Sequence, residues 1–442
     1  MSVMTDQKLR MEDRFQVMYE QHNGHALNGS NASLTTIRQD AIEDFAKIGL
    51  PHKKTEAWKY TRIEKALSKD VQIQLQTATS SLQVADLAPF QIPELDAYRV
   101  VFLNGHMQPA LGDLNGFTAG VTLTDLCTAS TEHADLMNPH FAQYANPDSD
   151  AFVALNTAFA KDGLFLHVPQ RTVLDKPIHV IHLFDMQADQ MLQPRMLFVA
   201  EAGSQVKVIE SFASLNNGAA TFVNSVTEWV VEARAHVDHY QLQEFGEETT
   251  VVADIHAQQA ATSFFSTHTT SLTGKMIRNN LTIVPDAEDC ESHLFGFVLG
   301  KNDMHVDNHT LVDHKKPNCF SNELYKNILD DASTGIFNGK VFVRPDAQKI
   351  NAYQSNKSIT LTPKAQMYSK PELEIYADDV RCSHGATTGQ LDEDALFYLR
   401  ARGINETQAR SLLLMAFARD VIDNIKIEPL RAFVDDKIAA RL

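Results

Sequence analysis

The feature that most constrains the fold is a stretch of about 200 residues, from about 165 to 375, with many short β-forming runs and no long helical periodicity. Gly, Asn, Asp and Pro residues separate the runs and are typical of turns. A β-rich region of this size without helices folds as a large sandwich, a propeller or a solenoid. The clearest runs in this stretch and just before it are 99–103, 164–168, 178–181, 205–209, 227–231, 281–284, 340–343 and 358–361.

Internal similarity favours the solenoid among these three. The segment 283–287 (IVPDA) resembles 343–347 (VRPDA), and 201–206 loosely resembles 232–237. A strand, a sharp turn and a second strand that recur on this scale are typical of a parallel β-helix, in which each coil buries its neighbour. The expected core is therefore a parallel β-helix.

Helical patterns precede this core. Ser33 is expected to cap a helix that ends at Gly49 and Pro51. The apolar face of that helix consists of Ile37, Ala41, Phe45 and Ile48. The aromatic residues of 58–60 (WKY) are interpreted as packing of a small N-terminal domain, with a contact surface as the less favoured alternative. The polar stretch from 72 to 83 is interpreted as a linker.

Helical patterns return after Gly389. Asp392 is expected to cap one helix, Asn405 to open a second in a capping box with Gln408, and Pro429 to stand in the first turn of a third. The apolar residues of the second and third helices are Ala409, Leu412, Leu413, Ala416, Phe417, Leu430, Phe433, Val434 and Ile438. Two amphipathic helices at a chain end either cover the open end of the solenoid or dock a partner.

We therefore predict three regions. These are an N-terminal helical domain (1–95), a parallel β-helix core (96–388) and a C-terminal helical domain (389–442). A chain of 442 residues with 44% hydrophobic content is large enough for two to three domains.

Composition excludes several classes of function. The formal net charge is -17 and no basic stripe interleaved with aromatic residues is found, so we expect no nucleic-acid binding. No run of about 20 apolar residues is present, so we expect no membrane span. Four cysteines without a C-x-x-C pair suit a reducing compartment, and the charged first residues do not resemble a signal peptide. The expected location is the cytoplasm.

The segment 378–389 carries the most distinctive chemistry. Cys382 and His384 stand two residues apart after an alternating apolar run, so on a strand they point to the same face. A thiolate and an imidazole on one face can hold iron or zinc, or relay a sulfur atom. Tetrahedral sites need four ligands, so further donors would come from elsewhere or from a partner. The alternative is a buried free cysteine beside a hydrogen-bonded histidine.

A second group of possible ligands is His293, His305, His309, His314 and Cys319. We interpret these mainly as residues satisfied within turns and strand ladders, and select His309 and His314 for testing. Motifs of P-loop nucleotide hydrolases, serine hydrolases, zinc proteases and dinucleotide-binding folds are absent from the sequence.

A longer ordered series of motifs identifies a family. Its segments include 309–314 (HTLVDH), 317–319 (PNC), 321–326 (SNELYK), 337–343 (FNGKVFV), 352–356 (AYQSN), 369–375 (SKPELEI), 378–387 and 396–404 (LFYLRARGI). In these segments the chain resembles the SufB/SufD family, the scaffold proteins of the Suf system of iron–sulfur cluster assembly. Within the family, 382–387 (CSHGAT) is similar to the SufD version, because SufB has Glu at the position of Gly385.

The resemblance implies a right-handed parallel β-helix between two helical domains. It also implies pairing with a SufB-like paralogue through the β-helices, and binding of a SufC-like ABC-type ATPase by the C-terminal region. Cys382 and His384 would then lie at the subunit interface, where a transient iron–sulfur cluster forms and the partner completes the ligand set. No tightly bound cofactor is expected, and flavin binding is left open.

The resemblance predicts a scaffold without catalytic activity of its own. One alternative is a SufB-like homodimeric scaffold, and whether the isolated chain forms a homodimer is left open. Another is a carbohydrate-active enzyme on a β-helix, with carboxylates such as Asp286, Asp289 and Glu291 as acid and base. The absence of a sugar-stacking aromatic cluster makes this enzyme reading weak.

Overall fold

The computed structural model describes most of the chain. The described residues are 11–23, 32–52, 54–67, 72–73, 82–160, 162–185, 187, 189–216 and 218–442. The linker predicted over 72–83 lies largely outside them, as do the first residues that bear on a signal peptide. No helix within these ranges is both long and apolar enough to span a membrane.

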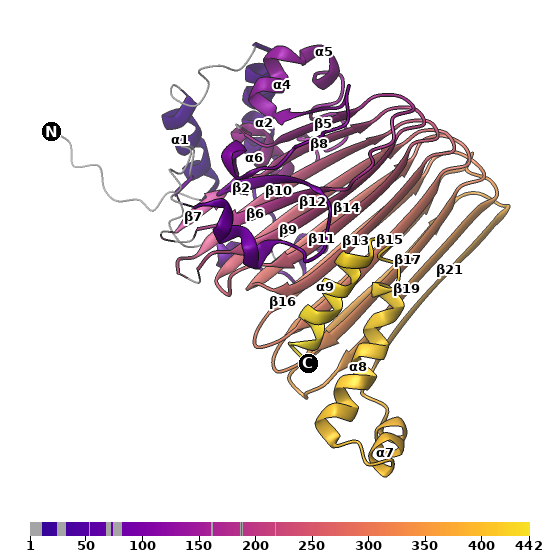
Figure 1. Cartoon of the computed structure of the whole chain (residues 1–442). Coiled ribbons are helices and arrows are strands. Elements are labelled where there is room, and N and C mark those ends of the chain that lie inside the picture. Colours follow the sequence, from indigo (N-terminus) through magenta and orange to yellow (C-terminus); the bar gives the residue numbers. More distant parts are fainter. Residues whose placement is uncertain are drawn as a thin grey trace.

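Two large sheets, here called sheet A and sheet B, face each other along the molecule (Figure 1). Sheet A contains β4 (Thr122–Asp125), β5 (Leu164–Val168), β8 (Arg195–Ala200), β10 (Thr221–Val231), β12 (Thr249–Gln259), β14 (Met276–Pro285), β16 (His305–His314), β18 (Thr334–Val343) and β20 (Gln366–Ile375), in this order, with β1 (Gln72–Ile73) and β7 (Gln190–Leu192) attached at the side.

Sheet B begins with a short antiparallel pair and continues with parallel strands. Its members are β3 (His106–Met107), β2 (Tyr98–Leu103), β6 (Ile178–Phe184), β9 (Gln205–Ser214), β11 (His236–Glu244), β13 (Phe264–Thr273), β15 (Glu291–Gly300), β17 (Phe320–Leu329), β19 (Ile350–Thr360) and β21 (Val380–Gly389). From β8 onward every strand in one sheet is followed in the chain by a strand in the other, and each pairs in parallel with its neighbours in the adjacent coils, except that the last coil has a neighbour on one side only. The predicted solenoid is therefore confirmed.

Successive coils stack in register. Glu291 pairs with Phe320, and Phe320 pairs with Asn351, so one coil takes about 30 residues. Gln205 likewise pairs with His236, which places the similar segments 201–206 and 232–237 at equivalent positions. The other similarity is shifted, because Ile283 shares its column with Val341 rather than Val343.

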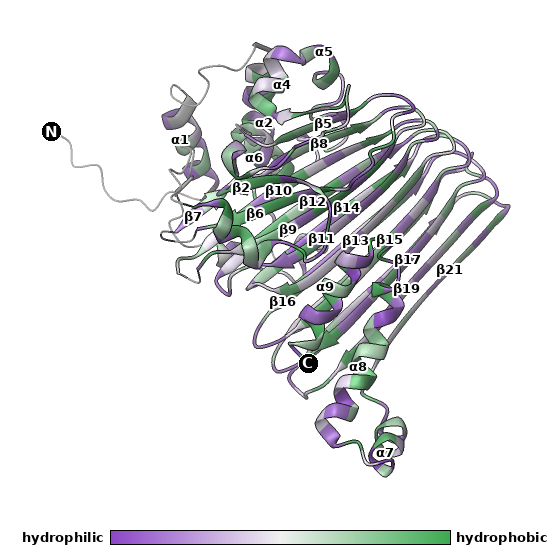
Figure 2. Ribbon diagram, in the orientation of Figure 1, coloured by the Kyte–Doolittle hydropathy of each residue, from purple (hydrophilic) through white to green (hydrophobic). Residues whose placement is uncertain are grey.

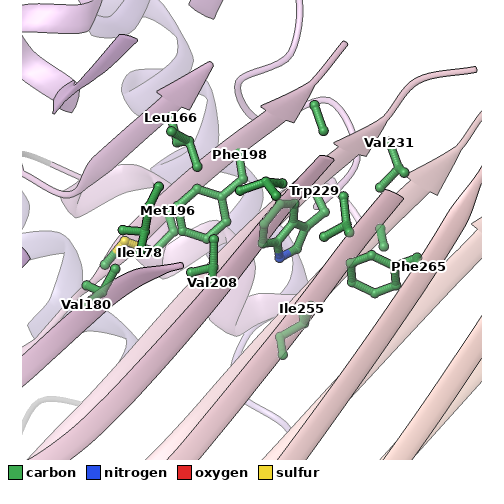
Figure 3. Close-up of a cluster of buried hydrophobic side chains, with 14 of the residues drawn as sticks. Leu166, Ile178, Val180, Met196, Phe198, Val208, Trp229, Val231, Ile255 and Phe265 are labelled. Atoms are coloured by element: carbon green, nitrogen blue, oxygen red, sulfur yellow. The ribbon is translucent and has the colours of Figure 1, made fainter. Parts of the chain in front are cut away.

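The space between the sheets is filled by large apolar side chains. Trp229 is fully buried, and its ring centroid lies 4.5 Å from that of Phe198 and 5.9 Å from that of Phe265, from strands of both sheets (Figure 3). Hydrophilic residues interrupt the hydrophobic ones along most strands (Figure 2). The predicted run 164–168 coincides with β5, but most other predicted runs are shorter than the observed strands, since buried Asn, Gln, Ser, Thr and His residues extend the ladders.

Helices and short 3-10 turns lie before and beside the first coils. They are α1 (Met11–Asn23), α2 (Ala32–Ile48), η1 (Glu56–Trp58), α3 (Ile63–Ala66), η2 (Val84–Phe90), η3 (Pro109–Leu111), α4 (Leu126–Glu132), α5 (Ala134–Met137) and α6 (Ala151–Phe159). Helix α2 begins at Ala32, so Ser33 stands inside its first turn and not before it. The helix ends as predicted, with Gly49 in a left-handed conformation. The patterns did not reveal α4, α5 and α6, which lie within the range 96–388.

The C-terminal helices are α7 (Glu393–Ala401), α8 (Glu406–Ile422) and α9 (Glu428–Ala439). Asp392 and Asn405 cap α7 and α8 through their side chains, and Pro429 stands in the first turn of α9, as predicted. The apolar face of α8 is rotated from the expected one, because Leu412 is exposed while Leu414 and Ala418 are buried.

Helices α8 and α9 pack on the outer face of sheet B and not over the end of the solenoid (Figure 1). Their apolar residues contact Phe295, Phe297 and Ile328. Lys326, which is almost fully buried, binds the carbonyl of Phe417 at 2.9 Å and the carboxylate of Asp420. The open end therefore stays uncovered by these helices.

Candidate functional site at the open end of the solenoid

Strands β20 and β21 form the last coil. Each is the edge of its sheet and pairs with a strand on one side only. Along the free side of an edge strand, backbone N–H and C=O groups lack ladder partners and can pair with another chain. Of the ten residues of β21, only Val380 and Cys382 are partly covered.

Cys382 and His384 both occupy columns that face the inside of the solenoid. Cys382 pairs with Ala352, which pairs with Ser321. His384 pairs with Gln354, which pairs with Glu323. The residues below them are buried, so the register confirms that the two side chains share one face of the strand.

The two side chains differ in accessibility. Cys382 is half-buried and packs against the apolar cluster that includes Ile350, Ala352 and Leu373. This burial raises the pKa of the Cys382 thiol, so the thiol is protonated at neutral pH. His384 is exposed at the open end. The coil thus offers an accessible imidazole beside a shielded thiol.

These two groups do not form a closed metal site by themselves. In the part of the chain that the structure describes, no group of three or more His, Cys, Asp or Glu side chains is arranged to hold a metal ion. A cluster bound here would need further ligands from another molecule.

A buried carboxyl stands in the same column as His384. Glu323 accepts hydrogen bonds from Thr310 and, at 2.7 Å, from Nε2 of Gln354. Burial raises the pKa of Glu323 to about 7. Sequence reasoning missed this residue, although the buried positions of β17 alternate as Ser321, Glu323 and Tyr325. That alternation was the available signal.

The two histidines selected for testing each have a local partner. Nε2 of His309 lies 3.0 Å from the carboxylate of Asp307, and Nε2 of His314 lies 3.0 Å from Oγ of Ser321. Burial lowers the pKa of His314 to about 4. Among the described residues, His309 is therefore satisfied within its strand ladder, whereas the buried Nδ1 of His314 has no hydrogen-bond partner.

The aromatic residues of the segment 56–61 pack on sheet A. Trp58 is buried, with the Arg278 guanidinium 4.5 Å from its ring centroid. Tyr60 stacks on Tyr368 of β20 at 4.4 Å, and Nζ of Lys370 lies 2.9 Å from the carboxylate of Glu56. A pocket of about 430 Å³ lies between this segment and strands β16, β18 and β20. These aromatic residues therefore pack against the solenoid as well as within the N-terminal region.

Helices α7 and α8 carry exposed large apolar side chains. Phe397, Tyr398 and Leu412 are 74%, 56% and 53% exposed. Exposed large apolar side chains mark interaction sites in many proteins. We call these three residues the helical patch.

The two stacked sheets of parallel strands place the chain in the class of parallel β-helix proteins. Comparison with known proteins gives the particular family. Residues 183–417 match the SufBD core domain of the SUF system of FeS cluster assembly, and residues 9–180 match the SufBD protein N-terminal region. The chain is a member of the SufBD family of iron–sulfur cluster assembly proteins.

Relatives cover nearly the whole chain. An iron–sulfur cluster assembly SufBD family protein of Synechocystis is 32% identical over 419 residues, covering 92% of this chain and 91% of the relative. The iron–sulfur cluster assembly protein SufD of Escherichia coli is 29% identical over 428 residues, covering 95% of each. The chloroplastic protein ABCI7 of Arabidopsis thaliana is 26% identical over 410 residues, covering 91% and 85%.

Membership in the family confirms the resemblance seen in the motifs. The chain takes part in Suf iron–sulfur cluster assembly as a non-catalytic scaffold component. It also acts together with other components of the Suf system. The reading as a carbohydrate-active enzyme is thereby set aside.

Proposed function

We propose that this chain is the SufD-like subunit of a Suf complex, and that the last coil is its interface with a SufB-like paralogue. The observation that carries the proposal is the position of Cys382 and His384 in inward columns that are open at the edge strand β21. A second solenoid that docks there would cover both side chains and could supply the missing ligands.

Gly385 supports the SufD-like reading over the SufB-like one. SufB resembles this segment but has Glu at that position. A Cβ at Gly385 would meet no atom within 4 Å, so the structure has room for a larger side chain. The glycine is therefore not explained by packing, and the difference from SufB is chemical.

The partner of the helical patch is proposed to be a SufC-like ABC-type ATPase. Helix α8 is anchored on sheet B through Lys326, while Phe397, Tyr398 and Leu412 remain exposed. Movement of a docked ATPase would thus be passed through α8 to β15 and β17, which lie in the same sheet as β21. The iron–sulfur cluster is the cargo of the complex, and we place the complex in the cytoplasm.

Co-expression with the SufB-like and SufC-like proteins of the same cell tests the assembly. Light scattering of the purified material should show one species that contains all three chains. A chain that purifies alone, or that forms only a homodimer in the presence of both proteins, would contradict the proposal and favour the homodimeric alternative.

The site is tested within the same complex. His384→Ala should lower the yield of cluster while the three chains still co-purify, because His384 is exposed and supports no packing. His52→Ala is the matched control, since His52 is also exposed but lies in the N-terminal region. Unchanged cluster yield in His384→Ala would remove this residue from the site.

A further inference from the structure

Cys290 and Cys319 are stacked neighbours in successive coils. Each directly precedes a strand of sheet B, and the next residues, Glu291 and Phe320, pair with each other. The N–H of Phe320 donates to the carbonyl of Cys290 at 2.8 Å. Neighbouring strands lie about 4.8 Å apart. That spacing falls within the Cα range of about 4.4–6.8 Å found for disulfides.

The two thiols point to the same place. Both sulfur atoms lie 3.2 Å from the carbonyl oxygen of Ala287. The thiols also contact each other, and the pKa of Cys290 is lowered because the Cys319 thiol donates a hydrogen bond to its sulfur. Proximity, shared orientation and unequal acidity are what a pair of attacking and resolving thiols requires.

The pair lies just inside the surface. Both thiols are buried, but the turns that precede them are exposed at Glu288, Asp289 and Asn318. Asp289 and Asn318 have φ values of 61° and 63°, so each turn reverses sharply one residue before its cysteine. Opening of these turns would expose the thiols without breaking the strand ladder.

We propose that Cys290 and Cys319 form a reversible disulfide between coils when the protein meets a peroxide. The Cys290 thiolate attacks one peroxide oxygen, the O–O bond breaks, and Cys290 becomes a sulfenic acid as the first water leaves. The Cys319 sulfur then attacks the Cys290 sulfur, and the hydroxyl group leaves as the second water. Two thiols lose two electrons, and hydrogen peroxide is reduced to two waters. An external thiol reverses the bond by exchange.

The bond would form close to the last coil. Val343, Ile350 and the half-buried Cys382 belong to the same apolar cluster as Cys290 and Cys319. A disulfide in this cluster would therefore change the packing against Cys382. The proposal concerns the chemistry of the pair and does not depend on which partner docks at the edge.

The experiment uses the full-length chain, reduced and then freed of reductant. The chain is treated with hydrogen peroxide, denatured, alkylated and digested, and its cysteine-containing peptides are analysed by mass spectrometry. Two of the four thiols should be lost, with Cys290 joined to Cys319, and dithiothreitol should restore both. Cys290→Ser should keep all three remaining thiols after mild treatment, whereas Cys319→Ser should form a sulfenic acid at Cys290 that dithiothreitol reduces. The same treatment in guanidinium chloride should form the bond more slowly, since the fold brings the thiols together.

Other results would overturn the proposal. These are full alkylation of Cys290 and Cys319 after peroxide, a bond that involves Cys127 or Cys382 instead, or accumulation of sulfinic acid at Cys290 without a bond. A bond that forms as fast in the denatured chain would show that the native stacking contributes nothing.

Discussion

The middle and the last coil of the solenoid use the same inward columns for different purposes. In β15 only Glu291 is exposed, whereas eight of the ten residues of β21 are exposed. The column that holds Leu294 and Glu323 inside the molecule ends at His384. A position that packs in the middle of a stack becomes a surface at its end, since no further coil covers it. The comparison shows how a repeating architecture yields one chemically distinct coil.

The two regions should also differ in stability. Trp229, Phe198 and Phe265 fill the middle coils, while β20 and β21 bury few large side chains. Elements with few buried apolar contacts open most readily in native proteins. The last coil is therefore the part of the solenoid that a partner can stabilise most.

The largest effect is expected in the middle coils. Trp229→Ala should lower the free energy of unfolding by about 3–5 kcal/mol, because it removes a fully buried indole between the sheets. Tyr353→Ala on the exposed side of β19 is the control and should change it by less than about 1 kcal/mol. Urea denaturation measures both. Equal losses for the two variants would contradict the contrast between middle and surface positions.

The next effect depends on pH and concerns Glu323, the buried carboxyl in the same column as His384. The pKa of Glu323 is raised from 4.5 to about 7 in the fold. The folded state therefore binds a proton that the unfolded chain has lost between these values, and stability falls as pH rises from about 4.5 to 7. The loss from this group is on the order of 3 kcal/mol.

The variant Glu323→Gln isolates this effect. Gln cannot ionise, so the stability of the variant relative to the unchanged chain should increase between pH 5 and pH 8. Urea denaturation at both values gives the difference, and histidine titrations common to both proteins cancel. A difference that does not vary with pH would show that Glu323 does not carry this titration.

A smaller effect on stability, with a large effect on binding, is expected at the helical patch. Phe397→Ala should change the free energy of unfolding by less than about 0.5 kcal/mol, because the ring is exposed. Binding of the SufC-like ATPase, measured by calorimetry, should weaken by about tenfold or more. Val84→Ala provides an exposed apolar control outside the patch. Unchanged affinity of the Phe397→Ala variant would show that the docking surface lies elsewhere.

A small effect on stability is also expected at the site itself. Cys382→Ser and His384→Ala should each leave the free energy of unfolding within about 1 kcal/mol, since β21 is an edge strand. Thermal unfolding measures this. A loss as large as that of Trp229→Ala would mean that the pair serves packing and not the interface.

The architecture could be predicted from the sequence, but the polar residues buried inside the solenoid could not. Turn residues and apolar runs predicted the strands, and caps such as Asp392 and Asn405 predicted the ends of helices, because both act over a few residues. The buried polar residues Glu323 and Gln354 could not be placed, since their burial depends on coils about 30 residues away. The prediction of which side of α8 is exposed was wrong for the same reason, because packing on sheet B determines which face of the helix is buried.

The candidate site was predictable in part. The two-residue spacing of Cys382 and His384 gave their common face, because a strand has a period of two. The spacing could not show that the two residues lie on the last coil. The position of an edge depends on where the stack ends, which the parallel pairing of β19 with β21 establishes.

Hydrogen exchange of this chain, alone and bound to the SufB-like paralogue, tests the central claim most directly. The amides of β20 and β21 should exchange rapidly in the free chain and gain protection in the complex, while those of β10 and β12 remain unchanged. A stoichiometric complex that leaves β20 and β21 unprotected would show that the open end of the solenoid is not the interface.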